Sequence, residues 1–342
     1  MSSSTDFGSG APLPVGVIGC GRMGRLHARV YSQMPGVKLV GVADANPQSA
    51  EETARQYGCE SFTDPRDLLS RVKAVTITVP TECHVAAAEP FLRAGIACLI
   101  EKPLAKDAAD CRRIIELAAA GGAVVQVGHV ERFNPIVRAL FDLKWQPTYI
   151  EVVRVSPMSF RSIDVGVVLD MMIHDLDIVL KLANSPVAKV QAVGGNVVGT
   201  VEDVANAYIT FASGCVASVT ASRIAAATER RLRVFGNGAF ASINYQKKQG
   251  AVVMRGANLP AVREAIARTR GGASVDLSGL TYADLLTVQP LEVEDVEPLR
   301  AELDAFVDAV TTGTTPQVTA EDGAAAVELA ERIVHEIRPQ TL

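Results

Sequence analysis

The sequence has no excess of basic residues. Its 342 residues include 33 Lys and Arg against 38 Asp and Glu, which gives a formal net charge of -5 at pH 7. Because a nucleic-acid backbone is bound by a basic surface, a mildly acidic chain is a poor candidate for a nucleic-acid-binding protein. We therefore expect no nucleic-acid partner.

The sequence also lacks two patterns that mark other protein classes. None of the six cysteines forms a C-x-x-C pair, and none has metal-ligand spacing with a histidine. No run approaches the roughly 18 apolar residues that a membrane-spanning helix needs. We therefore predict free thiols, no metal site and no membrane partner.

A secretory signal is not evident at the start of the chain. Residues 1–12 have neither the basic stretch nor the apolar stretch of a signal peptide. We interpret these residues as a flexible tail. The expected location is the cytoplasm, where thiols stay reduced.

What the chain does contain is enough apolar material for a sizeable core. Hydrophobic residues make up 48% and charged residues 21% of the sequence, as in ordinary folded proteins. A chain of this length is expected to form about two domains.

Residues 13–128 alternate short apolar runs with helical patterns, which is typical of βαβ units and a parallel sheet. The helix over Asp107–Ala120 has a capping aspartate at its start and a Gly-Gly stop at its end. Strands are predicted at Val15–Ile18, Lys38–Ala43, Ala74–Val79, Ala97–Ile100 and Val124–Val127.

After about residue 147 the pattern changes to period-2 alternation, which predicts a largely antiparallel sheet with one covered face. Residues 255–295 are Gly-rich and give no clear assignment. Strands are predicted at Tyr149–Val155, Val187–Val198, Ala205–Phe211, Val216–Arg223 and Arg231–Phe235, and helices over Val168–Leu182, over Leu299–Val310 and from about Thr319 onward.

A glycine-rich turn follows the first predicted strand and opens the first predicted helix. It reads Gly19-Cys20-Gly21-Arg22-Met23-Gly24, a G-x-G-x-x-G pattern, and Asp44 ends the second strand about 20 residues further on. In a dinucleotide site the glycines serve the tight turn, the approach of the pyrophosphate and the packing of helix on strand, while the acid accepts the ribose hydroxyls. Asp44 would repel a 2′-phosphate, so NAD is expected rather than NADP.

Further motifs follow in order along the chain. They are Pro80-Thr81 with His84, Glu101-Lys102-Pro103, Gly128-His129-Val130-Glu131-Arg132-Phe133-Asn134-Pro135, and Asp170-Met171-Met172-Ile173-His174-Asp175. Together with the glycine-rich turn, this series resembles the Gfo/Idh/MocA family of sugar oxidoreductases over nearly the whole chain.

The resemblance implies an α/β fold with two domains. An N-terminal Rossmann NAD-binding domain at residues 13–128 is followed by a C-terminal α/β domain at residues 129–342 with an open, mainly antiparallel sheet. The second domain would bind substrate and form a homo-dimer or tetramer, and its last helix could pack back on the first domain. The resemblance also implies that Arg22, Met23, Pro80, Thr81, His84, Glu101 and Lys102 lie at the cofactor, and that the Lys102–Pro103 bond is cis.

The residues themselves suggest a division of labour for oxidising a secondary alcohol. The reaction needs a base for the hydroxyl proton and a cation near the oxygen. Asp170 and His174 lie four residues apart on a predicted helix, so they share a face. His174 titrates near neutral pH and is the better base, with Asp170 orienting its ring or raising its basicity. Lys102, at a strand end, would stabilise the oxygen, although Lys102 as the proton acceptor is also chemically possible.

Three residues are predicted to bind the substrate. Val165–Asp177 and the Glu131–Pro135 segment are similar to the branch of the family whose members oxidise the 3-hydroxyl of UDP-N-acetylglucosamine before a transaminase makes a 3-amino sugar for lipid A. A diphosphate needs positive groups, and Arg132, Arg154 and Arg161 lie near the domain junction or in the loop before the helix of Asp170 and His174, with Arg161 preferred. Asn134 is also predicted to bind the substrate. An ion pair of Arg161 with Asp164 is an equally good interpretation of that arginine.

Two other functions remain open from the sequence. One is an NAD-dependent dehydrogenase of a free sugar or polyol such as myo-inositol, which needs no diphosphate site. The other is an NAD-binding sensor without catalysis, against which the joint presence of Lys102, Asp170 and His174 argues. His84 is interpreted either as a residue beside the nicotinamide or as a structural histidine.

Overall fold

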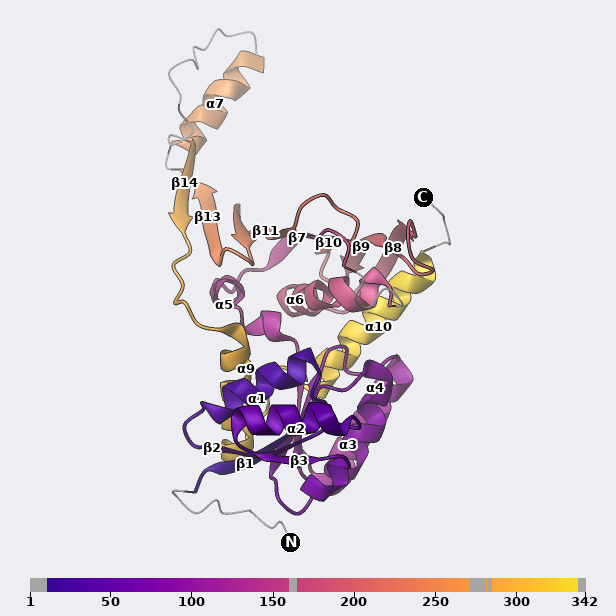
Figure 1. Cartoon of the computed structure of the whole chain (residues 1–342). Helices are drawn as coiled ribbons and strands as arrows, with labels where there is room; N and C mark the ends of the chain where they lie inside the picture. The colour runs from indigo at the N-terminus through magenta and orange to yellow at the C-terminus, as the bar shows by residue number, and fades with distance from the viewer. Residues whose placement is uncertain (1–10, 160–164, 257, 271–280, 282–284, 338–342) are drawn as a thin grey trace. The chain divides into compact units, whose positions relative to one another are not determined.

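The computed structural model describes residues 11–159, 165–256, 258–270, 281 and 285–337. The chain forms two compact units (Figure 1). The first unit comprises Met1–Phe133 and Val296–His335, and the second comprises Asn134–Asp295 and Glu336–Leu342. The domain boundary after residue 128 stays a prediction, and residues 1–10 of the predicted tail lie outside the described residues.

The first unit is built on a parallel six-stranded sheet with the order β3-β2-β1-β4-β5-β6. The order reverses between β1 and β4, which is where open α/β sheets bind ligands at their carboxyl ends. Its strands are β1 (Leu13–Ile18), β2 (Val37–Ala43), β3 (Glu60–Phe62), β4 (Ala74–Ile77), β5 (Ala97–Glu101) and β6 (Val125–Gly128).

Helices of the first unit begin and end at the signals that the sequence carries. Asn46 caps α2 by accepting from two backbone N–H groups, and Asp107 caps α4 by accepting from the Asp110 N–H. Gly58 and Gly122 end these two helices in the left-handed conformation that favours glycine. The helices are α1 (Arg22–Ser32), α2 (Pro47–Tyr57), α3 (His84–Arg93), α4 (Ala108–Gly121), α9 (Pro298–Thr312) and α10 (Ala320–Glu336), with the short turns η1 (Pro65–Leu68), η2 (Thr81–Cys83) and η3 (Val130–Phe133).

Helix α9, which precedes the last helix of the described chain, belongs to the core of the first unit. Its buried residues Leu299, Leu303 and Phe306 share one hydrophobic cluster with side chains of β1, β2, α1 and α2. Residues nearly three hundred positions away thus complete the core that begins at Leu13. Burial of such apolar side chains is the main stabilising contribution to a fold of this kind.

The second unit is built on an eight-stranded sheet with the order β14-β13-β12-β11-β7-β10-β9-β8. Only the β10–β7 pair is parallel among these described strands, so the predicted mainly antiparallel sheet is confirmed. Its strands are β7 (Pro147–Val155), β8 (Val187–Gly195), β9 (Val204–Phe211), β10 (Val216–Ser222), β11 (Glu229–Gly236), β12 (Ala239–Asn244), β13 (Gln249–Arg255) and β14 (Leu286–Pro290).

Helices cover one face of this sheet. α5 (Pro135–Asp142) packs on β12, and α6 (Ile173–Ala183) packs on β7 and β10. Beyond the β13–β14 edge, α7 (Leu259–Arg270) projects away from the sheet (Figure 1). No helix in the described part of the chain has the length and apolarity to cross a membrane.

Successive side chains along the strands of the second unit alternate between a buried face and an exposed face of the sheet. Ile150 and Val152 on β7 are fully buried, as are Ala207 and Ile209 on β9. Between the latter two, Tyr208 is 45% exposed, so the second face of the sheet is accessible in the single chain. This is the period-2 pattern expected of a sheet with one covered face.

Candidate active site

The glycine-rich turn between β1 and α1 has the geometry of a phosphate-binding loop. Gly19 adopts a φ of +95°, and a Cβ there would lie 2.8 Å from the Thr78 backbone. A Cβ on Gly24 would lie 1.8 Å from the Gly19 carbonyl oxygen, so helix and strand pack closer than any side chain allows. Gly21 instead has no atom within 4 Å of its Cβ position. That open space, at the start of a helix whose first N–H groups have no side-chain cap, fits a pyrophosphate.

Asp44 lies beside this turn, at the end of β2. Its Oδ2 accepts the Cys20 N–H at 2.6 Å, and its Oδ1 accepts the Asn46 N–H at 2.8 Å. Each carboxylate oxygen keeps a further lone pair. Asp44 therefore shapes the turn and can still accept the hydroxyls of a ribose.

Lys102 follows the end of β5. Its side chain is partly exposed, and the Lys102–Pro103 bond is cis, as the resemblance implies. The Lys102 backbone N–H donates to the side chain of Glu101 at 3.2 Å. Lys102 thus lies at the carboxyl edge of the parallel sheet, on the same side as the glycine-rich turn.

His84 joins the ends of two neighbouring strands. The side chain is 1% exposed, with Nδ1 3.1 Å from the Leu104 carbonyl oxygen and Nε2 3.1 Å from the Val79 carbonyl oxygen. Burial lowers the pKa of the ring, against the opposing effect of those two carbonyls. This ring ties the Lys102–Leu104 segment to the end of β4, beside the partly exposed Thr81 and the exposed Pro80.

A buried polar cluster lies under Glu101, and only one of its members was expected from the sequence. Nε2 of His27 lies 3.1 Å from Oε1 of Glu101. One ligand-type atom from each of His27, Glu101 and Glu302 lies within 4.8 Å of the others, which makes this the one group in the described residues able to surround a metal ion. A sequence signal for Glu302 exists: it falls on the apolar face of α9 with Leu299, Leu303 and Phe306.

The helix of the second unit that carries Asp170 and His174 opens with a π-helical turn. The expected helix over Val168–Leu182 is a π-helix at Val168–Met172, which contains Asp170, followed by α6 with His174 in its first turn. Both side chains are partly exposed. Single π-turns inside helices occur frequently at functional sites. Because the helix is continuous, the pair stays one turn apart as predicted.

Long-range contacts fix the start of this helix. The Glu202 carboxylate accepts the Val168 N–H at 3.2 Å, and a Cβ on Gly166 would collide with that carboxylate at 2.0 Å. Arg223 donates to the Val165 carbonyl and lies 3.6 Å from Asp203. The entry to the π-turn is therefore held by side chains from a different part of the second unit.

A second buried ion pair lies under the same helix. Arg154 on β7 contacts Asp175 through two hydrogen bonds, at 2.6 and 2.9 Å, and both side chains are at most 3% exposed. The Arg154 guanidinium also lies 5.2 Å from the centre of the Tyr245 ring. This pair anchors α6, next to His174, to the sheet.

The predicted substrate residues lie in three settings. Arg132 on η3 is 6% exposed, and its guanidinium lies 3.4 Å from Asp322. Asn134 caps α5 and is 5% exposed. Arg161 lies outside the described residues. The roles of all three in substrate binding stay predictions.

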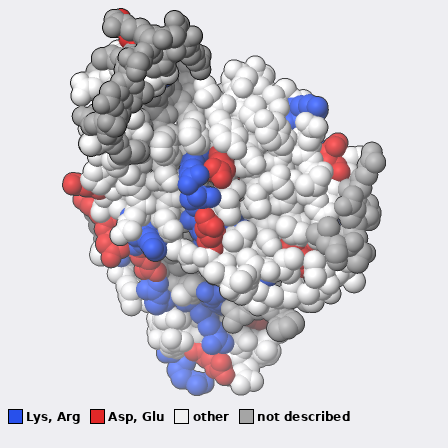
Figure 2. Space-filling view, turned by 90° about the horizontal axis from the view of Figure 1, so that it is seen from above, with Lys and Arg blue, Asp and Glu red and all other residues white. Residues whose placement is uncertain are grey.

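Charge is mixed on the face seen in Figure 2, where basic and acidic side chains lie next to one another and much of the surface is uncharged. Several of the basic residues are paired on the sheet of the second unit, as Arg231 and Arg233 are with Glu151. Over the part of that face that the structure describes, no broad basic surface of the kind that binds a nucleic-acid backbone is present.

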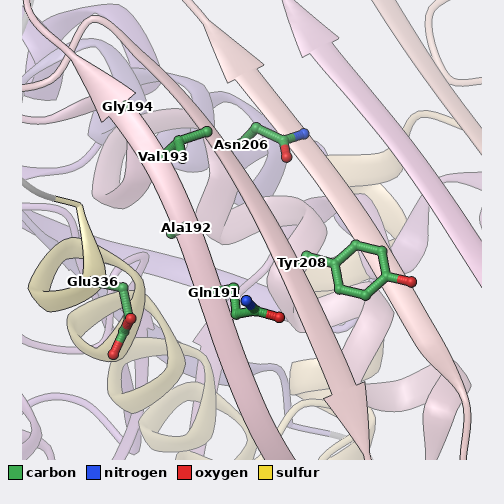
Figure 3. Close-up of a pocket in the computed structure, with 7 residues that line it drawn as sticks. All are labelled: Gln191, Ala192, Val193, Gly194, Asn206, Tyr208 and Glu336. Atoms are coloured by element: carbon green, nitrogen blue, oxygen red, sulfur yellow. The ribbon is translucent and has the colours of Figure 1, made fainter.

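A shallow hollow of about 370 Å³ lies on the open side of β8 and β9. Figure 3 shows Gln191, Asn206, Tyr208 and Glu336 around it. It is lined by residues of β8 and β9 and by Glu336 at the end of α10, and contains none of the predicted catalytic residues. We therefore do not assign it to catalysis.

Comparison with known proteins gives a consistent result. The profile of the oxidoreductase family with an NAD-binding Rossmann fold matches residues 13–129, and the profile of the GFO/IDH/MocA C-terminal domain matches residues 137–241. UDP-N-acetylglucosamine 3-dehydrogenase of Acidithiobacillus ferrooxidans is 37% identical over 257 residues, which cover 74% of this chain and 82% of that protein.

Two further similarities bear on the substrate. Inositol 2-dehydrogenase of Rhizobium meliloti is 28% identical over 94% of this chain and 96% of that protein. A solved structure of the Acidithiobacillus ferrooxidans UDP-N-acetylglucosamine 3-dehydrogenase superposes with a TM-score of 0.85 at 29% identity, covering 96% of this chain and 98% of the other.

Proposed function

The chain belongs to the Gfo/Idh/MocA family of oxidoreductases, and from this premise we propose that it oxidises the 3-hydroxyl of UDP-N-acetylglucosamine to a ketone with NAD. That it is an NAD-dependent sugar or polyol dehydrogenase follows from the family and its relatives. The observation that supports the nucleotide sugar is the 37% identity to the Acidithiobacillus ferrooxidans enzyme, which exceeds the 28% identity to the Rhizobium meliloti inositol enzyme.

The proposed chemistry removes two hydrogens from the secondary alcohol: one leaves the carbon as a hydride and one leaves the oxygen as a proton. When bound, NAD accepts the hydride from the carbinol carbon. A ring nitrogen of His174 takes the hydroxyl proton, so the products are ketone, NADH and one proton. The Lys102 ammonium donates a hydrogen bond to the oxygen as negative charge develops on it. Asp170, one helical turn before His174, orients the ring or raises its basicity.

The first unit would hold the cofactor through groups already in place. The N–H groups at the start of α1, with Arg22 and Met23, face the pyrophosphate over Gly21, and Asp44 accepts the ribose hydroxyls. Pro80, Thr81, His84 and Glu101 shape the nicotinamide end, around Lys102. For the substrate, Arg161 and Arg132 are assigned to the diphosphate and Asn134 to the sugar.

Partners and location complete the proposal. The product ketone is chemically suited to a transaminase, giving the 3-amino sugar of a lipid A precursor. The open sheet face around Tyr208 (Figure 3) is the surface on which a homo-dimer or tetramer would form. We assign the protein to the cytoplasm, where NAD and nucleotide sugars are present.

The experiment is NADH formation by the purified protein with a panel of substrates and a carbonyl trap, since alcohol oxidation by NAD is often uphill. The panel holds UDP-N-acetylglucosamine, UDP-glucose, myo-inositol and glucose. Signal with UDP-N-acetylglucosamine alone supports the proposal, and the position of the ketone is then read from the trapped product. Signal with the free polyols alone rejects the nucleotide sugar.

Residue roles are tested with matched controls. Lys102→Met and His174→Asn are expected to lower kcat by more than a hundredfold, while NAD affinity stays within about twofold, because each loses roughly 3 kcal/mol or more of transition-state stabilisation. Lys106→Met and His335→Asn, at exposed positions, serve as controls. Wild-type turnover in both test variants would contradict the mechanism.

A second candidate, oxidation of a free polyol such as myo-inositol, is favoured by one observation. The inositol enzyme of Rhizobium meliloti aligns over 94% of this chain, against 74% for the nucleotide-sugar enzyme. Arg161→Ala separates the two: it should raise KM for a UDP-sugar and leave KM for a polyol unchanged.

A further inference from the structure

Beneath the end of β5, the first unit buries four polar side chains from four elements. They are His27 on α1, Glu101 on β5, Gln126 on β6 and Glu302 on α9. His27, Gln126 and Glu302 are 0% exposed, and Glu101 is 8% exposed. Buried polar groups in native proteins are almost always paired, so a cluster of this kind needs an explanation.

The contacts between the polar atoms of the cluster indicate which of them carry protons. Glu101 accepts the Lys102 backbone N–H on Oε2, and its Oε1 faces Nε2 of His27. A carboxylate in this position needs a donor, so His27 carries its proton on Nε2. Gln126 donates to the Glu302 backbone carbonyl at 3.0 Å. These contacts leave both side-chain oxygens of Glu302 without a hydrogen-bond partner among the described residues.

Two carboxylates in one dry site do not both ionise readily. Burial, and then the nearby Glu101 charge, raise the pKa of Glu302 well above its usual value. Burial also raises the pKa of Glu101, but the hydrogen bond and charge of His27 and the charge of Lys102 outweigh it and bring the pKa below the usual value. The two shifts therefore separate the carboxyl groups, and Glu302 is the one that holds its proton to higher pH.

We propose that Glu302 is a positioning residue: a buried carboxylic acid, with an oxygen within 4.8 Å of the Glu101 carboxylate, that keeps its proton at neutral pH and so leaves one negative charge under Lys102. That single charge holds the His27 ring and the Lys102 main chain, and it attracts the Lys102 ammonium. The inference deepens the proposed function, since it rests on Lys102 as the group that contacts the substrate oxygen.

A bound cation is the other way to satisfy this cluster, and the structure favours the proton. Structural zinc takes four protein ligands, and magnesium keeps several waters. The described residues supply one ligand-type atom from each of His27, Glu101 and Glu302, with no exposure at two of the three side chains. A proton needs neither a fourth ligand nor water.

Other charged groups face Glu302 and enter its pH dependence. On α1, Tyr31 lies near enough for Glu302 to raise its pKa, although burial is the larger cause. η3 packs on α9 and carries Arg132, which is paired with Asp322. The charged, histidine and tyrosine residues of the elements around Glu302 are Arg22, Arg25, His27, Arg29 and Tyr31 on α1, Glu101 at the end of β5 with Lys102 after it, Glu131 and Arg132 on η3, and Arg300, Asp304 and Asp308 on α9 itself.

The first test looks for the acid proton directly, in the protein without substrate. Infrared difference spectra at neutral pH are expected to show the C=O band of a protonated carboxyl in the wild type. The band should be absent in Glu302→Gln and kept in Glu328→Gln, a control at an exposed position of α10. A band that survives in Glu302→Gln, or no band in the wild type, overturns the proposal.

The second test uses stability against pH. Between the usual pKa of a glutamate and its raised value in the folded state, the native protein binds more protons than the unfolded chain, so stability falls as pH rises. Urea unfolding of the wild type should show this fall relative to Glu302→Gln. Parallel curves for the two proteins contradict the proposal, as does a stoichiometric divalent cation found by elemental analysis.

The third test reads the positioning role, once a substrate turns over. Glu302→Leu removes the acid proton beside Glu101. This variant is expected to lower kcat about tenfold, with NAD affinity and sugar KM within about twofold of the wild type. Glu302→Gln, whose amide also donates, should recover most of kcat; equal losses in both variants reject positioning. Because the infrared and unfolding tests need no turnover, failure on every sugar would reject the proposed function without touching this inference.

Discussion

The candidate residues of the first unit and those of the second unit are positioned by different means. At the glycine-rich turn of the first unit, the backbone itself is the device: Gly19 takes a positive φ, and Gly24 leaves no room for a side chain. At the helix of the second unit that carries Asp170 and His174, buried ion pairs hold the geometry, with Arg154 on Asp175 and Arg223 near Asp203. The geometry of the turn is determined by residues that are neighbours in the sequence. The geometry of the helix depends on residues that are distant in the sequence and are brought together by folding.

The largest expected effect lies in the second unit. Arg154→Met leaves the Asp175 carboxylate buried without its partner, and removing one member of a buried pair costs about 3–5 kcal/mol. Urea unfolding should show that loss. Arg233→Met, whose contact with Glu151 is half-exposed, is the control and should cost at most about 1 kcal/mol. Equal losses at the two positions would mean that the ion pair under α6 is not what holds the helix.

The next largest loss of stability is expected at the glycine-rich turn of the first unit. Gly24→Ala forces a Cβ against the Gly19 carbonyl and is expected to cost about 3 kcal/mol by overpacking. Gly21→Ala meets no protein atom and should leave stability within about 0.5 kcal/mol, as is usual for open surface sites.

The same two variants separate an effect on folding stability from an effect on NAD binding. Gly21→Ala should still weaken NAD binding at least tenfold, or about 1.4 kcal/mol, because the new methyl group occupies the space over the turn. Thermal unfolding and NAD titration of both variants are the measurements. Normal NAD affinity in Gly21→Ala would place the pyrophosphate elsewhere.

A smaller and pH-dependent effect is expected at Asp203. Burial raises its pKa, but the N–H groups of Val197, Val198 and Gly199 and the charge of Arg223 outweigh this and bring the pKa below the usual value. A lowered pKa adds stability above the unfolded value that is lost as pH falls through the folded value.

Asp203→Asn should therefore cost about 2 kcal/mol at pH 7, in the range for charge-assisted hydrogen bonds, and progressively less below about pH 4. Urea unfolding from pH 7 to pH 3 measures the difference. A cost that stays constant over this range would assign it to packing and not to the carboxylate charge.

The smallest expected effect concerns cofactor choice. Asp44→Ala removes an acceptor for the ribose hydroxyls and should weaken NAD about tenfold, or about 1.4 kcal/mol, and bring NADP closer to NAD. The ratio of kcat/KM for the two cofactors is the measurement. Part of any loss belongs to the turn, since Asp44 also accepts the Cys20 N–H, and Asp44→Asn keeps an acceptor there as a control.

Much of the fold could be predicted because its signals are local. The parallel strands before residue 128 follow from apolar runs, and β9 and β10 are joined through Gly214, where φ is +86°. The strands β12 to β14 and helix α7 were not predicted. Their residues are Gly-rich or weakly periodic, so their pairing comes from neighbouring strands and not from their own sequence.

The site divides in the same way. The glycine spacing with Asp44, and the order of Lys102, Asp170 and His174, could be read along the chain. The π-turn that carries Asp170 could not, since helical periodicity in sequence does not distinguish it from an α-helix.

The sequence by itself determined the cofactor turn, the strand and helix order and the family, because glycines, caps and apolar periodicity act over a few residues. Only the tertiary structure decided that Glu302 lies within 4.8 Å of His27 and Glu101, and that Arg154 faces Asp175. The physical reason is that the charge state and cost of a buried polar group depend on which groups the fold removes from water beside it, and those groups are far apart in the chain.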